Sequence, residues 1–162
     1  MKSASDTWTY CFLIPVYNHA ALLKNTIPQF LQFGIPLIIV DDGSNEENKI
    51  ILKGIVDAHP AIVLISNIQN SGKGFAIKQG IEYCKRLTID FAFQVDADNQ
   101  HSLAAVPEFL NRSKAQKSIK HSIIGYPIYD DTVPTIRKDA RKISNFFVSV
   151  TTLTPDVRDS LC

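Results

Sequence analysis

The sequence FAFQVDAD at residues 91–98 joins an apolar run to two carboxylates that are separated by one residue. The run is short and apolar, as expected of a strand that is covered on both faces. Asp96 and Asp98 repel each other, and each resists ionisation unless a cation lies close by. Mg²⁺ binds to proteins through one or two carboxylates together with substrate phosphates. The stretch therefore indicates either a metal site at a strand end or a solvated acidic turn that caps the next helix.

Similar apolar runs recur along the chain and alternate with segments of helical character. Such alternation is typical of an α/β fold, a mainly parallel sheet with helices on both faces. A length of 162 residues suits one domain, so we expect residues 1–162 to form a single unit. The predicted strands cover residues 10–14, 37–40, 62–65 and 91–95, with a weaker fifth at 122–124, and the predicted helices cover 20–33, 46–58, 74–87 and 103–114.

A polar motif follows each of the first four predicted strands. Ligands of parallel α/β sheets bind outside the carboxyl ends of the strands. The motifs should therefore meet at one edge of the sheet, where we expect the binding site. They are PVYN at 15–18, DDGS at 41–44, NSGKG at 70–74 and DADNQH at 96–101.

The motif DDGS at residues 41–44 has two interpretations. Its residue types favour turns, and Ser44 is a suitable N-cap for the helix that follows. A carboxylate at a strand end can also accept hydrogen bonds from a ribose hydroxyl or a base N–H. The two roles are compatible, with Asp42 in the binding site and Ser44 at the helix N-terminus.

The motif NSGKG at residues 70–74 opens a predicted helix. Its glycines let backbone N–H groups approach a ligand, and a helix N-terminus attracts anions. Lys73 adds a full positive charge. The spacing is neither that of a Walker A loop, because Asn67 and Gly74 break it, nor that of a dinucleotide fingerprint, because Ile77 replaces the third glycine. The loop predicts an anion site or, alternatively, an ordinary helix start.

Two further features have both a structural and a functional explanation. His101 follows Asp98 by three residues, where it would complete a carboxylate–carboxylate–histidine metal site, contact substrate, or act as a structural side chain. A basic cluster precedes an apolar stretch that begins at Phe146, and it is either a solvated helix face or a site for anionic lipid head groups. The cluster consists of Arg137, Lys138, Arg141 and Lys142.

Composition narrows the class of protein. The formal net charge of +1 gives no electrostatic case for a nucleic-acid partner. Three cysteines without CxxC spacing indicate reduced thiols. The N-terminal residues lack the apolar core of a signal peptide, and no apolar run approaches the roughly 18 residues of a membrane span. We expect a cytoplasmic protein, with peripheral binding at the inner membrane face as its route to a membrane.

Taken in order, the four motifs resemble those of the family 2 glycosyltransferases. They are most similar to the branch of dolichyl- and polyprenyl-phosphate sugar transferases, whose metal motif typically runs Asp-Ala-Asp-x-Gln-His. The resemblance extends from Phe12 to the end of the chain. It implies a GT-A fold with a nucleotide-sugar site at the carboxyl edge, a nucleoside diphosphate sugar as donor, and Mg²⁺ or Mn²⁺ as cofactor. It also implies inversion at the anomeric carbon and a polyprenyl phosphate acceptor.

The resemblance implies roles for individual residues as well. Asp42 would bind the ribose or the base, and Lys73 would lie near the diphosphate. Asp98 would be the main metal ligand and a catalytic residue, while Asp96 would contact the sugar or ribose side and complete the metal site with His101. If the acceptor were a hydroxyl, Asp159 would be the catalytic base. The other implied binding residues are Pro15, Tyr17 and Asn18 in the nucleotide pocket, Gln100 beside the metal–diphosphate or sugar, and Arg137 and Arg141 near phosphates.

The last four residues, DSLC at 159–162, resemble the start of an acceptor-side motif that usually continues as Gly-Phe-Arg. We therefore interpret the chain as a complete donor-binding half followed by part of an acceptor half. Two alternatives are a truncated domain that binds nucleotide without turnover and a phosphoacceptor receiver domain. A receiver domain should carry its acid pair after the first strand, where this chain has PVYN at 15–18. The oligomeric state stays open.

Overall fold

A computed structural model of the chain describes residues 9–98 and 103–115. The chain divides into two units, Met1–His121 and Ser122–Cys162, and every described residue belongs to the first. The single domain over residues 1–162 therefore stays a prediction. The predicted fifth strand at 122–124 lies outside the described residues.

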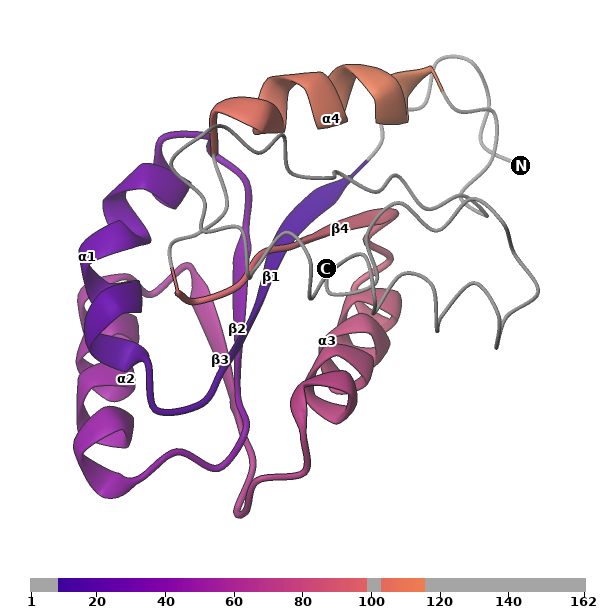
Figure 1. Cartoon of the computed structure of the whole chain (residues 1–162). Helices are drawn as coiled ribbons and strands as arrows, with labels where there is room; N and C mark the ends of the chain where they lie inside the picture. The colour runs from indigo at the N-terminus through magenta and orange to yellow at the C-terminus, as the bar shows by residue number, and fades with distance from the viewer. Residues whose placement is uncertain (1–8, 99–102, 116–162) are drawn as a thin grey trace, which may run out of the picture. The chain divides into compact units, whose positions relative to one another are not determined.

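Strands and helices alternate in the described residues as predicted (Figure 1). The elements are β1 Tyr10–Val16, α1 Ala20–Leu31, β2 Leu37–Asp41, α2 Glu46–Ala58, β3 Ile62–Ser66, α3 Lys73–Arg86, β4 Phe91–Gln94, the 3₁₀ helix η1 Leu103–Ala105 and α4 Val106–Lys114. β1 continues past its predicted end at Ile14, through Pro15 and Val16. The helix predicted from Leu103 begins with the 3₁₀ turn η1 before the α-helix starts.

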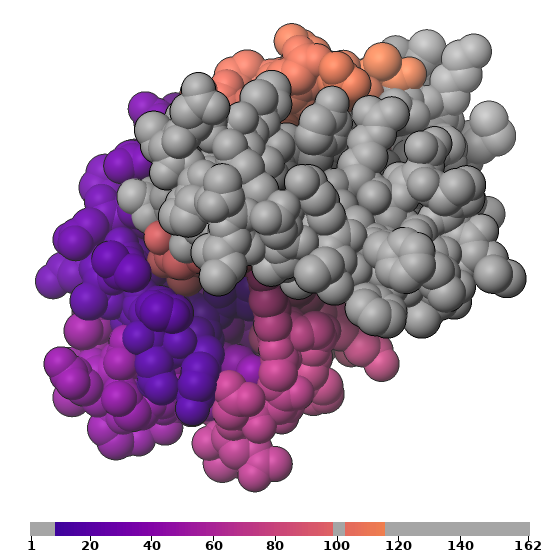
Figure 2. Space-filling view, in the orientation of Figure 1, coloured from indigo at the N-terminus to yellow at the C-terminus, as the bar shows by residue number. Residues whose placement is uncertain are grey.

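The four strands are parallel and lie in the order β3-β2-β1-β4. The chain moves outward from β1 to β2 and β3, and then returns to place β4 on the other side of β1. α1 and α2 cover one face of the sheet, and α3, which makes the return connection, covers the other (Figure 1). In the space-filling view, α1 and α2 form an indigo-to-purple surface next to the magenta surface of α3 (Figure 2). The predicted parallel α/β fold is confirmed.

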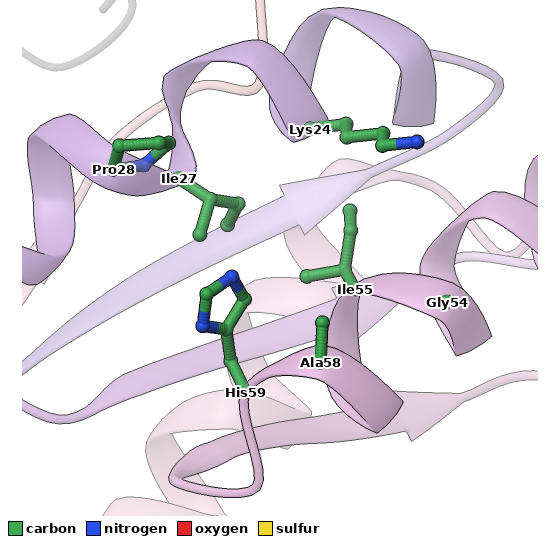
Figure 3. Close-up of a pocket in the computed structure, with 7 residues that line it drawn as sticks. All are labelled: Lys24, Ile27, Pro28, Gly54, Ile55, Ala58 and His59. Carbon is green, nitrogen blue, oxygen red and sulfur yellow. The ribbon is translucent and has the colours of Figure 1, made fainter.

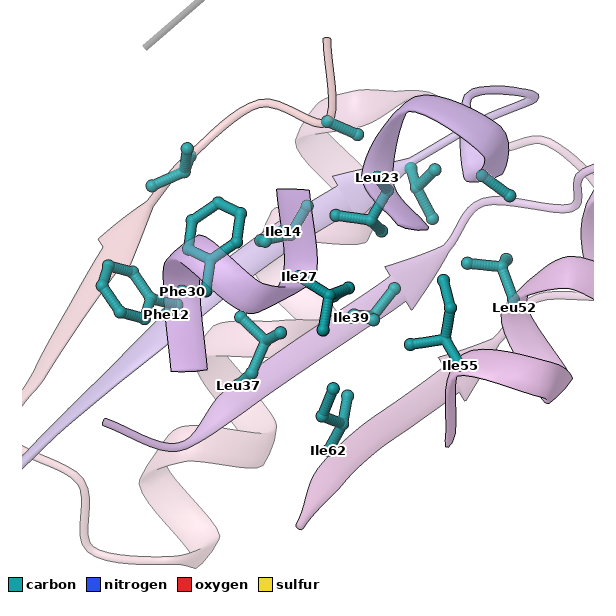
Figure 4. Close-up of a cluster of buried hydrophobic side chains, with 14 of the residues drawn as sticks. Phe12, Ile14, Leu23, Ile27, Phe30, Leu37, Ile39, Leu52, Ile55 and Ile62 are labelled. Atoms are coloured by element: carbon teal, nitrogen blue, oxygen red, sulfur yellow. The ribbon is translucent and has the colours of Figure 1, made fainter. Parts of the chain in front are cut away.

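β1 lies at the centre of the core because its side chains alternate between the two faces. Phe12 and Ile14 pack on the side of α1 and α2, whereas Cys11 and Leu13 pack on the side of α3, and each is at most 1% exposed. Figure 4 shows the first of these clusters, in which the Phe12 ring meets the Phe30 ring edge-on with centroids 5.1 Å apart. Burial on both faces explains why the strand is a continuous apolar run without polar alternation.

The N-termini of α1 and α2 are joined by hydrogen bonds at the carboxyl edge of the sheet. Asn45 is the N-cap of α2, and its side chain accepts a hydrogen bond from the Asn48 N–H at 3.0 Å. The Asn48 side chain accepts one from the N–H of Ala20, the first residue of α1, at 2.9 Å. The prediction that Ser44 caps α2 is therefore wrong. The Ser44 hydroxyl instead accepts a hydrogen bond from the Asn18 N–H at 2.9 Å.

Candidate functional site

The candidate site begins where the strand order reverses, at the carboxyl ends of β1 and β4. Crevices in open α/β sheets form at such a switch point. The Val95 N–H donates to the Leu13 carbonyl at 3.1 Å, and the next bond of this ladder would need an N–H at residue 15. Pro15 has no N–H, so the ladder between β1 and β4 ends there. β1 and β2 continue to pair through Val16 and Asp41, so β1 separates from β4 at the predicted binding edge.

The loop after β1 contains one exposed aromatic side chain and one polar side chain that is already engaged. Tyr17 is 46% exposed, whereas Pro15 is buried within β1. Asn18 has a positive φ of 57°, and its side-chain oxygen accepts a hydrogen bond from the Asn45 N–H at 2.9 Å. Of these three predicted nucleotide-pocket residues, Tyr17 alone presents a side chain that is both exposed and without a role in the loop's own hydrogen bonds.

The end of β2 and the turn that follows it carry two buried carboxylates. Asp41 is fully buried, and one of its oxygens accepts the Ser44 N–H at 3.0 Å; within the described residues, the other oxygen, Oδ2, has no hydrogen-bond partner. Asp42 is 3% exposed. Its Oδ1 accepts hydrogen bonds from the Asn67 side chain at 3.1 Å and from the Ser71 N–H at 3.0 Å. Its Oδ2 accepts the Gly72 N–H at 2.7 Å.

The Asp42 carboxylate thus organises the loop between β3 and α3. Gly43, with φ +72°, lies against this loop so closely that a Cβ atom would come within 2.5 Å of the Asn70 backbone nitrogen. Gly72 is the N-cap of α3 and has φ 96°, a conformation that non-glycine residues rarely adopt. The turn at 41–44 and the glycine-rich loop therefore form one packed assembly. The two motifs that the sequence placed at the same edge are in direct contact.

Lys73, the first residue of α3, connects this assembly to the end of β4. Its ammonium lies 2.7 Å from Asp96 Oδ2, and the two side chains are 50% and 27% exposed. The other oxygen, Oδ1, accepts a hydrogen bond from the Gln94 side chain at 2.7 Å. Sequence reasoning did not assign a role to Gln94 or Asn67. The sequence feature that could have identified Gln94 is a polar residue inside an apolar strand. For Asn67, the sequence contains no such feature apart from its position directly after β3.

The residues near β4 fit a divalent metal by their chemistry. Asp96 and Asp98 supply oxygen ligands, Asp96 is partly exposed, and the neighbouring ammonium of Lys73 already compensates negative charge. Among the described residues, no three His, Cys, Asp or Glu side chains form a metal cluster. Such a site would therefore be completed by substrate phosphates or by residues outside the described range. The predicted site residues that lie outside that range are Gln100, His101, Arg137, Arg141 and Asp159.

Two other features lie away from this edge. A pocket of about 140 Å³ opens between α1 and α2, as Figure 3 shows, and none of the predicted site residues lines it. On the opposite face, Cys11 and Cys84 are buried with their sulfur atoms 3.3 Å apart. The hydrogen bond between the two thiols raises the pKa of Cys11, as does burial, and it lowers the pKa of Cys84. In the part of the chain that the structure describes, no helix is long and apolar enough to cross a membrane.

Curated relatives of the chain are sugar transferases. The chain is 26% identical over 133 residues to a dolichyl-phosphate beta-glucosyltransferase of Trichomonas vaginalis. The alignment covers 75% of this chain and 38% of that protein. It is 30% identical over 121 residues to an undecaprenyl-phosphate 4-deoxy-4-formamido-L-arabinose transferase of Pseudomonas fluorescens, over 70% of this chain and 33% of that protein. The chain thus spans between a third and two fifths of the length of these relatives.

A solved structure shares the fold. The mannosyltransferase of Pyrobaculum calidifontis, determined in complex with GDP-Man and Mn²⁺, superimposes with a TM-score of 0.54 at 17% sequence identity, over 70% of this chain and 34% of that one. The likeness confirms the predicted GT-A fold. The family described as Glycosyl transferase family 2 matches residues 11–150. Because this match covers more than half of its length, the chain belongs to glycosyl transferase family 2.

Proposed function

We propose that this domain transfers a sugar from a nucleoside diphosphate sugar to a polyprenyl phosphate, with Mg²⁺ or Mn²⁺ bound at Asp96 and Asp98. The observation that carries the proposal is the chain of contacts from Asp42 through the glycine-rich loop to Lys73 and Asp96. It joins the start of α3, where we expect an anion to bind, to a pair of acids at the switch point of the sheet. Family membership supports the reaction class.

The nucleoside would lie over the loop after β1, and the diphosphate would lie toward α3. Tyr17 offers an exposed aromatic ring on which a base can stack, and Pro15 is buried in the strand before it. The N-terminus of α3 attracts anions through the helix dipole, and the half-exposed Lys73 adds a positive charge. Asp42 and Asn18 would serve the nucleotide by holding the backbone of the two neighbouring loops in place.

Asp98 and Asp96 would hold the metal, with His101 and Gln100 as further partners of the metal or the diphosphate. A divalent ion bound there supplies stabilisation of the charge that develops on the leaving diphosphate. Within the chain, Lys73 would share this task through its positive charge. A mannosyltransferase of the same fold was determined with GDP-Man and Mn²⁺, which supports a donor and a metal of this kind.

The acceptor is proposed from the names of the relatives, which contain dolichyl phosphate and undecaprenyl phosphate. A phosphate monoester with a second pKa of ~6 is largely anionic at neutral pH, so its oxygen can attack without a general base. The bond from the anomeric carbon to the diphosphate would break as the bond to the acceptor phosphate forms, with inversion. Arg137 and Arg141 would bind the acceptor phosphate at the cytoplasmic face of a membrane. Asp159 would act as base only for a hydroxyl acceptor.

The decisive experiment measures sugar transfer and nucleotide binding with the same protein. Purified chain is incubated with UDP- and GDP-sugars, a short polyprenyl phosphate and Mn²⁺ or Mg²⁺, and lipid-linked sugar is separated by extraction. Calorimetry then measures the affinity for UDP and GDP with metal and with chelator. Asp98→Asn should abolish metal-dependent binding, whereas Asp57→Asn, which removes an exposed acid on α2, should not.

Each outcome separates the proposed enzyme from the alternatives. Metal-dependent nucleotide binding with transfer supports the full proposal. Metal-dependent binding without transfer or donor hydrolysis, in this chain and in a version extended past Cys162, favours a non-catalytic nucleotide-binding domain. Equal affinity for every nucleotide with and without metal contradicts the metal assignment.

A further inference from the structure

We infer that Lys73 occupies the metal's place on Asp96 when no donor is bound, and that it transfers to the donor diphosphate when the metal arrives. Metal and diphosphate then bind cooperatively, with Lys73 as the positioning residue that couples them. The inference rests on the proposed function, because it concerns the same donor site.

The geometry makes Lys73 a direct competitor for a metal ligand. Its ammonium lies 2.7 Å from Asp96 Oδ2, whereas the Gln94 side chain binds the other oxygen, Oδ1. A cation that binds Asp96 through Oδ2 must therefore displace the ammonium. The hydrogen bond from Gln94 keeps the carboxylate oriented during that exchange.

The exposure of the pair makes the exchange easy. Lys73 is 50% exposed and Asp96 is 27% exposed, so water screens their attraction. Ion pairs of this kind contribute about a two- to fivefold factor to an equilibrium constant. A divalent cation that carries twice the charge can overcome such a factor, whereas a fully buried pair would resist it.

Hydrogen bonds hold the backbone just before Lys73, whereas the Lys73 side chain is half exposed. Asp42 accepts the Gly72 N–H at 2.7 Å and the Ser71 N–H at 3.0 Å, which holds the residues just before α3 in place. The long side chain of Lys73 can therefore turn from Asp96 to a ligand at the helix N-terminus without movement of the loop. That N-terminus is itself a favourable place for a phosphate.

Cooperativity follows from where the displaced ammonium goes. When metal binds alone, Lys73 loses its carboxylate partner and gains none in return. When a diphosphate is present, the ammonium gains an anionic partner as it leaves Asp96. The metal therefore binds more tightly in the presence of the diphosphate, and by linkage the diphosphate binds more tightly in the presence of the metal.

The test measures the affinity for Mn²⁺ itself, by the electron paramagnetic resonance signal of free Mn²⁺, so that it does not depend on activity. The full chain is titrated alone and with saturating UDP or GDP, after correction for Mn²⁺ bound to nucleotide in protein-free buffer. Lys73→Met removes the ammonium, and Lys73→Arg keeps a cation there. Lys78→Met removes a lysine from the same helix and serves as the matched control. Thermal melts confirm that all variants are folded.

We expect Lys73→Met to bind Mn²⁺ alone about two- to fivefold more tightly than the wild type, because the competing cation is gone. The increase in Mn²⁺ affinity caused by nucleotide should shrink by at least the same factor. Lys78→Met should bind Mn²⁺ alone with an affinity close to that of the wild type. Lys73→Arg should bind Mn²⁺ alone with the same affinity or more weakly.

The possible failures are distinguishable. Unchanged or weaker Mn²⁺ binding by Lys73→Met, in a protein whose nucleotide binding depends on metal, overturns the inference and leaves the proposed function intact. An equal gain in Lys78→Met shows that net charge alone is responsible, and this also overturns it. A wild type that binds nucleotide equally well with and without metal contradicts the proposed function itself.

Discussion

Two acid pairs lie at the same edge of one sheet, but their side chains differ in exposure and in hydrogen-bond partners. After β2, Asp41 and Asp42 are 0% and 3% exposed, and Asp42 binds two backbone N–H groups and a side-chain amide. After β4, Asp96 is 27% exposed and is bound by the side chains of Lys73 and Gln94. Asp41 and Asp42 are thus bound mainly by backbone N–H groups, whereas Asp96 is bound by the side chains of Lys73 and Gln94, both of which are exposed.

The difference separates structural acids from acids that are available for exchange. Removing a buried carboxylate leaves its donors unsatisfied in a poorly hydrated place, which costs stability. Removing a partly exposed carboxylate leaves donors that water can reach, which costs little. We therefore expect substitutions after β2 to lower the free energy of unfolding, and substitutions after β4 to lower ligand affinity instead.

Gly43→Ala should have the largest effect. The new Cβ would meet the backbone of Gln69 and Asn70, which cannot rotate away, and alanine at φ +72° is strained as well. We expect a loss of about 3 kcal/mol in the free energy of unfolding, measured by urea denaturation. Gly34→Ala is the matched control, because Gly34 also has a positive φ of 62° but a Cβ added there would have no atom within 4 Å. It should lose only about 1 kcal/mol. Equal losses would show that the contact between the two loops adds nothing.

Asp42→Asn should follow, with a loss of about 2 kcal/mol of stability. The amide has nearly the same shape but only one acceptor oxygen. If that oxygen faces Asn67 and Ser71, the amide NH₂ opposes the Gly72 N–H, so two donors meet. Urea denaturation measures the loss, and nucleotide affinity is measured at a temperature where the variant is fully folded. Wild-type stability with impaired nucleotide binding would instead assign Asp42 to direct contact with the ligand.

Asp96→Asn tests the other side of the comparison. Its ion pair is partly exposed, so we expect a change in stability below about 1 kcal/mol. Metal-dependent nucleotide affinity should fall at least about tenfold, which corresponds to about 1.4 kcal/mol. Calorimetry with Mn²⁺ and either UDP or GDP measures the affinity, and Asp57→Asn is the control for loss of an acid elsewhere. A large loss of stability without loss of affinity would reverse the roles of the two acid pairs.

The layout of this edge follows from the sequence, whereas its internal contacts do not. Strands buried on both faces leave a continuous apolar signature, as in residues 37–40, and parallel order then brings their following motifs together. The partners of Asp42 lie 25 to 30 residues further along the chain, and Lys73 is 23 residues from Asp96. Residue types alone do not reveal which donors meet which acid at such separations. Residue types also did not distinguish Ser44 from Asn45 as the N-cap of α2, because serine and asparagine are nearly equal N-caps.

Gln94 should give the smallest effect, and it tests whether the orientation of Asp96 matters. Gln94 is exposed at the end of β4, and its side chain donates to Asp96 Oδ1 at 2.7 Å. Gln94→Met keeps the length of the side chain but removes this donor, so stability should change by less than about 0.5 kcal/mol. A carboxylate that is held by one contact fewer must be ordered further when a metal binds. We therefore expect metal-dependent nucleotide affinity to fall about two- to fivefold, in line with the net contribution of one hydrogen bond.

The control is Gln29→Met, at an exposed position on α1, which should leave both stability and nucleotide affinity unchanged. If Gln94→Met binds as tightly as the wild type, Lys73 and the metal orient Asp96 without help, and the exchangeable site depends on fewer contacts than its geometry indicates.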